Sequence, residues 1–169
     1  RDLNKHVRRM IQDPRSFNFS KNFASQWLDV DRLERVIVDK KHSNGYSVDI
    51  KNSFKMETYS FFDHVLREDK SFMNLIDSDY ALLDWRLANF YKLPAVNNIN
   101  FQATPVTSEN RRGGILTNGG LLTALSTGKH SSPIKRGVWL ARKIVDSPPP
   151  KPPPNVPELD EEDPEAAKL

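Results

Sequence analysis

Few residues of this chain have the types and spacing that catalysis needs. Ser132 and Lys135 stand three positions apart, as in the Ser-x-x-Lys motif of some serine enzymes. Pro133 lies between them, however, and serine followed by proline is typical of a helix start, where the hydroxyl caps backbone amides and proline suits the first helical position. We therefore interpret Ser132 as a helix cap and predict no catalytic residue in this motif.

Several carboxylates offer general acid and base chemistry. Asp77, Asp79 and Asp84 lie close together in the sequence, and Glu57 lies at the margin of an apolar helical stripe. A catalytic pair requires a cleft and shifted pKa values, and Asp79 also stands where it can cap the helix predicted after it. A hydrolytic or carbohydrate-active domain that uses Asp77, Asp79 or Glu57 is therefore an alternative hypothesis, and a scaffold that binds cell-surface polymer is a third.

Metal and haem chemistry find little support in the sequence. The chain has no cysteine, which excludes a disulfide, a thiolate metal site and a CxxCH haem attachment within these residues. The four histidines are far apart in the sequence and form no metal-binding spacing. They are His6, His42, His64 and His130. His64, Met56 or Met73 could still supply a distal ligand to the haem of a partner domain. The competing interpretation is that each of these three residues is an ordinary core or rim residue. We expect no metal and no haem in this chain.

Two further motifs favour structural roles. The pairs Gly113-Gly114 and Gly119-Gly120 match neither a Walker loop nor a dinucleotide fingerprint, so we interpret the second pair as a site of close helix packing. Aromatic residues fall in apolar stripes rather than among basic residues, so we predict no nucleic-acid binding.

The densest local signal surrounds the helix predicted from Ser132 to about Val145. Lys135 and Arg136 place two cations in its first turn, where backbone amides also favour an anion. With Arg112, the residues Ser132, Lys135 and Arg136 form our candidate site for an anion or for docking to another domain. Pairing of these cations with local acids is the alternative.

Helical periodicity extends over most of the remaining chain. Apolar residues recur at spacings of three and four in residues 3–11, 16–28, 53–66 and 79–91. We predict a mainly α fold, an irregular orthogonal bundle of about six or seven helices with a proline-rich C-terminal strap. One core should unite large side chains from the whole chain. These are Phe19, Phe23, Trp27, Phe62, Leu83, Leu87 and Trp139.

Composition changes mark the predicted boundaries. Residues 1–100 form a helical module, residues 101–147 a glycine-rich loop and helix packed on it, and residues 148–169 a proline-rich and acidic tail. A short strand or strap begins near Phe101. Residues 158–169 contain six acids and one base, so the overall charge of +3 leaves +8 on the rest of the chain. Solvated lysines explain such a charge as well as an anionic partner does.

These same segments resemble a known group of domains. The likeness lies in Arg112-Gly-Gly-Ile-Leu-Thr, in Ser132-Pro-Ile-Lys-Arg-Gly-Val-Trp139, in the proline run with Asn-Val-Pro-Glu-Leu159, and upstream in Asn22-Phe-Ala-Ser-Gln-Trp-Leu28. Together they resemble the cytochrome-associated domains of unknown function in large secreted proteins of planctomycetes and related bacteria, as two adjoining modules. The loop Ser126-Thr-Gly-Lys-His-Ser131 departs from the pattern of those domains.

The resemblance implies a part of a larger secreted or periplasmic protein that also contains a c-type cytochrome-like domain. Haem c is then expected in that neighbouring domain, and the neighbouring domains are the expected partners. We expect this chain to be a non-catalytic accessory or docking module without a membrane span. It begins with Arg1 and enters a helical pattern at once, so we expect any targeting signal upstream.

Overall fold

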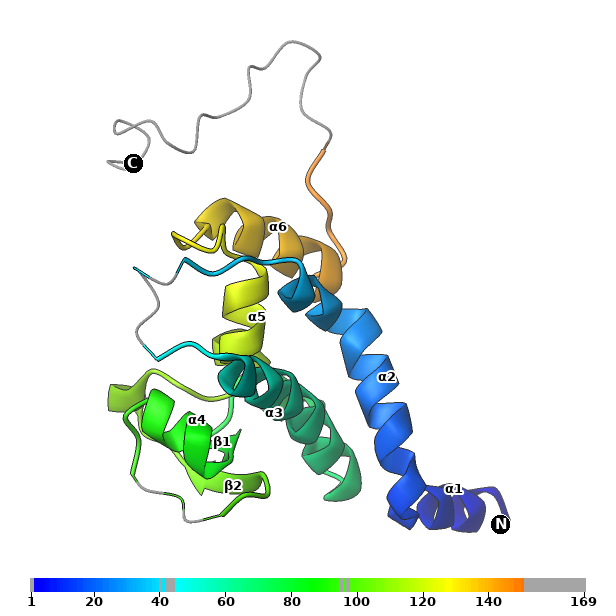
Figure 1. Ribbon diagram of the computed structural model, residues 1–169. Helices are drawn as coiled ribbons and strands as arrows, with labels where there is room; N and C mark the ends of the chain where they lie inside the picture. Colours follow the sequence, from blue (N-terminus) through cyan, green and yellow to red (C-terminus); the bar gives the residue numbers. More distant parts are fainter. Residues whose placement is uncertain (1, 40, 42–44, 95, 97, 151–169) are drawn as a thin grey trace.

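The computed structural model describes residues 2–39, 41, 45–94, 96 and 98–150. Within these residues the chain forms six α-helices, several short 3-10 helices and one two-stranded sheet (Figure 1). The predicted mainly helical class is therefore confirmed, whereas most of the proline-rich strap lies outside the described residues. The 3-10 helices are η1 (Pro14–Ser16), η2 (Val30–Glu34), η3 (Phe72–Leu75), η4 (Ser108–Asn110) and η5 (Ile115–Thr117).

The first two helices follow the predicted boundaries. Helix α1 (Asp2–Gln12) ends before Asp13, whose carboxylate accepts a hydrogen bond from the Arg15 N–H at 2.9 Å and so starts the next turn. Helix α2 (Phe17–Leu28) ends at Asp29, which adopts a left-handed conformation with φ of 56°. No residue of α1 is buried, so α1 contributes little to the core.

Helix α3 (Val48–Arg67) is the element around which the others pack. It contacts α2, α4, α5 and the first strand, and its capping residue is Ser47, whose hydroxyl accepts from the Ile50 N–H at 3.2 Å. Our predicted start near Ser53 was therefore about one turn too late. The polar composition before Ser53 is typical of a loop, but here it forms the solvent-exposed first turn of the helix.

A small sheet replaces part of a predicted helix. Strand β1 (Tyr80–Leu83) pairs antiparallel with β2 (Gln102–Pro105), and helix α4 (Trp85–Phe90) follows β1 directly. The prediction of a helix capped by Asp79 was wrong, because all four residues of β1 are buried and Asp84 caps α4, accepting from the Leu87 N–H at 2.8 Å. The short strand predicted near Phe101 is confirmed as β2.

The last two helices complete the fold. Helix α5 (Gly119–Ala124) packs on α3 and η2. In helix α6 (Pro133–Lys143) the Ser132 hydroxyl accepts from the Lys135 N–H at 3.4 Å and Pro133 occupies the first turn, as predicted.

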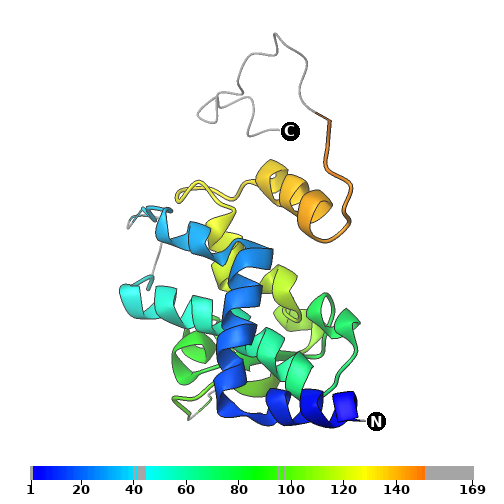
Figure 2. The same ribbon diagram turned by 90° about the vertical axis from the view of Figure 1, so that its right-hand side faces the viewer.

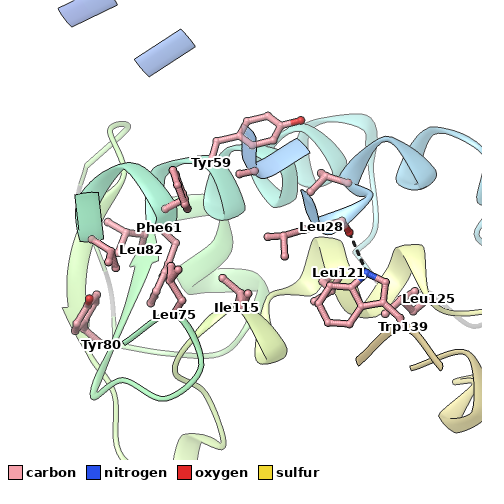
Figure 3. Packing of buried hydrophobic residues seen from close by; sticks show 14 residues of the cluster. Leu28, Tyr59, Phe61, Leu75, Tyr80, Leu82, Ile115, Leu121, Leu125 and Trp139 are labelled. Carbon is pink, nitrogen blue, oxygen red and sulfur yellow. Dashed lines mark hydrogen bonds between the residues drawn. The ribbon is translucent and has the colours of Figure 1, made fainter. Parts of the chain in front are cut away.

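Buried side chains between residues 24 and 139 form two core clusters, so the prediction of a single core was wrong. The first contains Phe62 and Trp139, and the second contains Leu83 and Leu87. Trp27 packs at the edge of the first cluster, and Figure 3 shows Trp139 within it. Two residues of the predicted core, Phe19 and Phe23, are instead exposed, at 56% and 41%. This part of the prediction was wrong because a different side of α2 faces the core. The buried residues of α2 are Ser20, Ala24 and Leu28.

The ends of α2 and α6 are joined by three specific contacts. The Trp139 indole N–H donates to the Leu28 carbonyl oxygen at 3.2 Å (Figure 3), and the Trp27 indole N–H donates to the Lys143 carbonyl oxygen at 3.1 Å. The Lys143 ammonium also lies 3.1 Å from an Asp29 carboxylate oxygen. Helix α6 is thereby held across the C-terminal end of α2 (Figure 2).

Candidate functional site

The most unusual group in the interior is the carboxyl of Glu57, in the middle of α3. Its side chain is 1% exposed, and Oε2 accepts hydrogen bonds from the Tyr91 hydroxyl at 2.7 Å and from the Gly119 N–H at 3.3 Å. The Gly119 N–H also donates to the Tyr91 oxygen at 3.0 Å. A buried acid is therefore shared by α3, by the residue after α4 and by the first residue of α5.

A cation completes this group, which we call the Glu57 cluster and define as Glu57, Tyr91, Arg112 and Gly119. The Arg112 guanidinium lies 3.3 Å from the centre of the Tyr91 ring, and its Nη1 donates to the Thr117 carbonyl oxygen at 2.8 Å. A guanidinium over an aromatic face is an attractive arrangement, worth ~0.5–2 kcal/mol. Arg112 therefore serves the packing of this cluster.

The Glu57 cluster retains a proton at neutral pH. Burial raises the pKa of Glu57 to about 8, although the Tyr91 hydrogen bond, the Arg112 charge and the Gly119 N–H all lower it. Burial and the neighbouring Glu57 also raise the pKa of Tyr91 well above its ordinary value. In the folded chain Glu57 is thus a neutral acid that bridges three elements.

This raised pKa predicts a dependence of stability on pH. Unfolded Glu57 loses its proton above its ordinary pKa of 4.5, whereas folded Glu57 keeps it up to about 8. Between these values the Glu57 contribution to the free energy of unfolding should therefore fall as pH rises, by up to about 1.4 kcal/mol per pH unit. Glu57→Gln should remove this contribution.

Urea unfolding of both proteins at pH 5, 6, 7 and 8 measures the effect. The difference in free energy between Glu57→Gln and the wild type isolates this group, because His64 and the other titrating residues contribute equally to both proteins. We expect the variant to gain stability relative to the wild type as pH rises. A difference that stays constant across this range would show that Glu57 is ionised in the fold.

The glycine pair at the start of α5 explains how α5 approaches Glu57. A Cβ atom at Gly119 would overlap the Phe54 ring and the Tyr91 hydroxyl, and one at Gly120 would press on the Phe54 backbone. The predicted role of this pair in close helix packing is confirmed. Because the backbone of α5 comes so near α3, the Gly119 N–H reaches the Glu57 carboxyl.

A separate polar cleft of about 490 Å³ lies beside α3, between Asp84 and the segment at residues 99–101. The Asp84 side chain is buried, and Oδ2 accepts from the Ser53 hydroxyl at 2.9 Å and from Arg86 at 3.5 Å. Its Oδ1 caps α4. Each oxygen of Asp84 therefore has a structural partner, and Glu57 is not among the residues that line this cleft.

The carboxylates of the alternative enzymatic hypothesis do not form one site. Glu57 is enclosed in the core, whereas Asp77 and Asp79 are exposed in the segment that leads into β1. The polar cleft instead contains Asp49 and Asp84.

The structure divides the four candidate binding residues between two places. Ser132, Lys135 and Arg136 lie together in the first turn of α6, whereas Arg112 precedes α5 and stacks on Tyr91. The Arg136 Nε atom is buried and has no hydrogen-bond partner among the described residues. The first turn of α6 therefore contains three of the four predicted residues, two of which are cationic.

The candidate haem ligands are spread over the fold. His64 is half-buried and packs edge-on against Tyr80 with ring centres 5.3 Å apart, and burial lowers the pKa of its imidazole. Met56 packs at the core edge, and Met73 is exposed on η3. His42 lies outside the described residues. The part of the chain that the structure describes contains no group of three or more histidine, aspartate or glutamate side chains arranged to hold a metal.

Sequence reasoning missed the Glu57 cluster, although part of it was visible. Glu57 and Thr58 stand three and four residues after Phe54, and Phe61 follows at the next turn, so all four share the buried side of α3. This spacing indicates a buried acid. The partners Tyr91 and Gly119, however, come from distant parts of the chain.

Comparison with known proteins follows the same two parts of the chain. Residues 1–93 match the family model PSD4, a protein of unknown function (DUF1592), and residues 112–169 match PSCyt3, a protein of unknown function (DUF1588). No curated protein and no solved structure matches the chain. The helical fold therefore combines two adjoining domains of unknown function, one with a cytochrome-associated name.

The chain belongs to the PSD4 family, whose model covers more than half of it. The resemblance to planctomycete cytochrome-associated domains is thereby confirmed. Within the described residues, no helix has the length and apolar character needed to cross a membrane.

Proposed function

We propose that the chain is a non-catalytic accessory module that docks beside a c-type cytochrome-like domain in the same secreted or periplasmic polypeptide. The cytochrome-associated name of the PSCyt3 match supports this function. In this proposal haem c belongs to the neighbouring domain, and residues 1–100 and 101–147 act as one support for it.

The observation that carries the proposal is the first turn of α6. Arg136 keeps a buried Nε atom without a hydrogen-bond partner among the described residues, and Lys135 adds a second cation beside it. Cations at the N-terminal end of a helix oppose its dipole, so an anion there is favoured by both cations and backbone amides. Trp139 anchors this helix in the core. The turn therefore offers a fixed site for a carboxylate or propionate-like group of the neighbouring domain.

Charge reversal tests this docking site. The variant Lys135→Glu with Arg136→Glu should bind the separately expressed cytochrome-like domain about tenfold more weakly than the wild type, since attraction becomes repulsion. Added salt should weaken binding of the wild type through screening. Isothermal titration calorimetry at two salt concentrations measures both effects.

A matched variant separates local contact from net charge. Arg35→Glu with Arg142→Glu makes the same change in charge at two exposed positions away from this turn, and we expect its affinity to fall far less. The proposal would be contradicted if the double variant at Lys135 and Arg136 bound with the same affinity as the wild type and its thermal unfolding were unchanged. The turn would then serve only as a helix cap.

A further inference from the structure

Helices α1 and α2 leave a group of large apolar side chains in solvent. Met10 is 60% exposed, and with Val7 and Ile11 it lines a groove of about 610 Å³ that also contains Phe19 of α2 and Leu66 of α3. The groove is bordered by α1, η1 and the first turns of α2. Exposed apolar side chains that gather in one groove are typical of a binding surface.

An aromatic row continues from this groove along α2. The ring centres of Phe19 and Phe23 are 5.8 Å apart, those of Phe23 and Trp27 are 5.8 Å apart, and Phe72 of η3 lies 6.1 Å from Trp27. We call Phe19, Phe23, Trp27 and Phe72 the aromatic row. Because Trp27 also binds the end of α6, the row connects the groove with the place where α6 ends. The backbone of α2 runs from α1 to this place (Figure 1).

The groove end of this surface is basic. Residues 2–21 contain five lysines and arginines against two acids, and Arg9 and Arg15 line the groove. Asp13, the acid of the groove, is paired with Arg15 at 2.7 Å. Among the described residues, none of the ion pairs involves Lys5, Arg8 or Arg9. The surface therefore suits a segment that carries acids and apolar groups.

The chain itself contains a segment with this composition. Residues 151–157 include four prolines, and residues 158–165 include six acids, with Val156 and Leu159 as apolar side chains. Proline-rich segments in the polyproline II conformation bind rows of aromatic side chains. Prolines thus match the aromatic row, and the acids match the basic groove.

The distances between these parts allow the match within one chain. The C-terminal end of α6 is held at the C-terminal end of α2 by the Lys143 and Asp29 pair. The 12 residues of α2 span ~18 Å from there to the groove. The segment 151–165 would span ~47 Å in the polyproline II conformation, at ~3.1 Å per residue. The acids of this segment therefore reach the groove. The spare length allows the change of direction that is needed because residues 148–150 lead away from α2 (Figure 1).

We propose that residues 151–165 bind in cis along α2, with their prolines on the aromatic row and their acids in the basic groove between α1 and α2. The segment then covers the exposed apolar surface of α1 and α2 and neutralises the cations of α1. This intramolecular contact is independent of the docking site on α6.

The absence of cysteine from the sequence makes a disulfide trapping experiment direct. Asn22→Cys places a thiol on the exposed side of α2, and Ala166→Cys places one just after the acids. Asn52→Cys on α3 is the control partner for Ala166→Cys, since Asn22 and Asn52 are both exposed helical asparagines. Under mild oxidation of dilute full chain, we expect the Asn22 pair to form an intramolecular disulfide at least ~10 times faster, because bound groups have a high effective concentration.

Adding Glu161→Gln and Glu162→Gln to the Asn22 pair should slow its oxidation severalfold, and so should added salt. Equal rates for the Asn22 and Asn52 pairs would overturn the proposal. Disulfides mainly between two chains would also overturn it, because the occupant of the groove would then be a second copy. Thermal unfolding of each variant in the reduced state confirms that rates are compared between folded proteins.

Discussion

Replacing Trp139 with alanine is expected to lower the free energy of unfolding by about 3–5 kcal/mol, the usual cost of removing a large buried aromatic side chain. Trp139 is 5% exposed and packs with Leu28, Leu121 and Leu125 in the first core cluster (Figure 3). The change would also leave the Leu28 carbonyl oxygen without its indole partner. Urea unfolding followed by far-UV circular dichroism measures the loss.

Trp85→Ala is the matched control for this prediction. Trp85 is 45% exposed, and its ring contacts the Arg86 guanidinium at 4.8 Å, so its replacement should cost about 1 kcal/mol or less. Similar losses in the two variants would contradict the role of Trp139 in joining α6 to the core.

Gly114→Ala should destabilise the fold by about 2–6 kcal/mol, because a strained backbone and an overpacked contact each cost about 1–3 kcal/mol. Gly114 has a φ of 72°, and a Cβ atom there would overlap the backbone carbonyl oxygen of Ile76. Backbone atoms on both sides leave little freedom to relax. Differential scanning calorimetry should show a clearly lower melting temperature.

Gly137→Ala is expected to change the stability of the fold in the opposite direction. Gly137 lies inside α6, and a Cβ atom there would have no heavy atom within 4 Å apart from its chain neighbours and the backbone of its own helix. Alanine in an exposed helix loses less conformational entropy than glycine on folding, so the variant should be more stable by about 0.5–1 kcal/mol. If both glycine variants were destabilised alike, the close approach of Gly114 to Ile76 would not be the cause.

The sequence predicted best those elements whose signals are local. Ser132 and Pro133 determine the start of α6 through their own side chains, so the cap and the first turn could be read directly. The end of α1 before Asp13 was also predicted correctly from the local sequence. In both cases the physical cause lies within a few residues of the boundary.

Prediction failed where two local interpretations competed. Tyr80 to Leu83 is a short apolar run, which fits a buried strand as well as the first turn of a helix. Asp79 and Asp84 are both suitable caps, and pairing with β2 selected Asp84. That partner strand lies some twenty residues downstream.

Helical periodicity also shows which residues share a side of a helix, but it does not show which side other elements of the fold will cover. Phe19 and Phe23 do lie on one side of α2, yet the neighbouring helices cover the side with Ser20 and Ala24. For the same reason Glu57 was assigned to the margin of α3. Contact with α5 at Gly119 helps to enclose the Glu57 side chain in the core.

The Glu57 cluster has a consequence for inheritance. It joins Glu57 and Tyr91, from the segment that matches PSD4, to Arg112 and Gly119, from the segment that matches PSCyt3. A gene exchange that replaced one segment alone would combine Glu57 with a residue 119 from an unrelated sequence, or the reverse. The two segments should therefore be transmitted as a pair, and substitutions at Glu57 or Tyr91 should be accompanied by substitutions at Gly119 or Arg112.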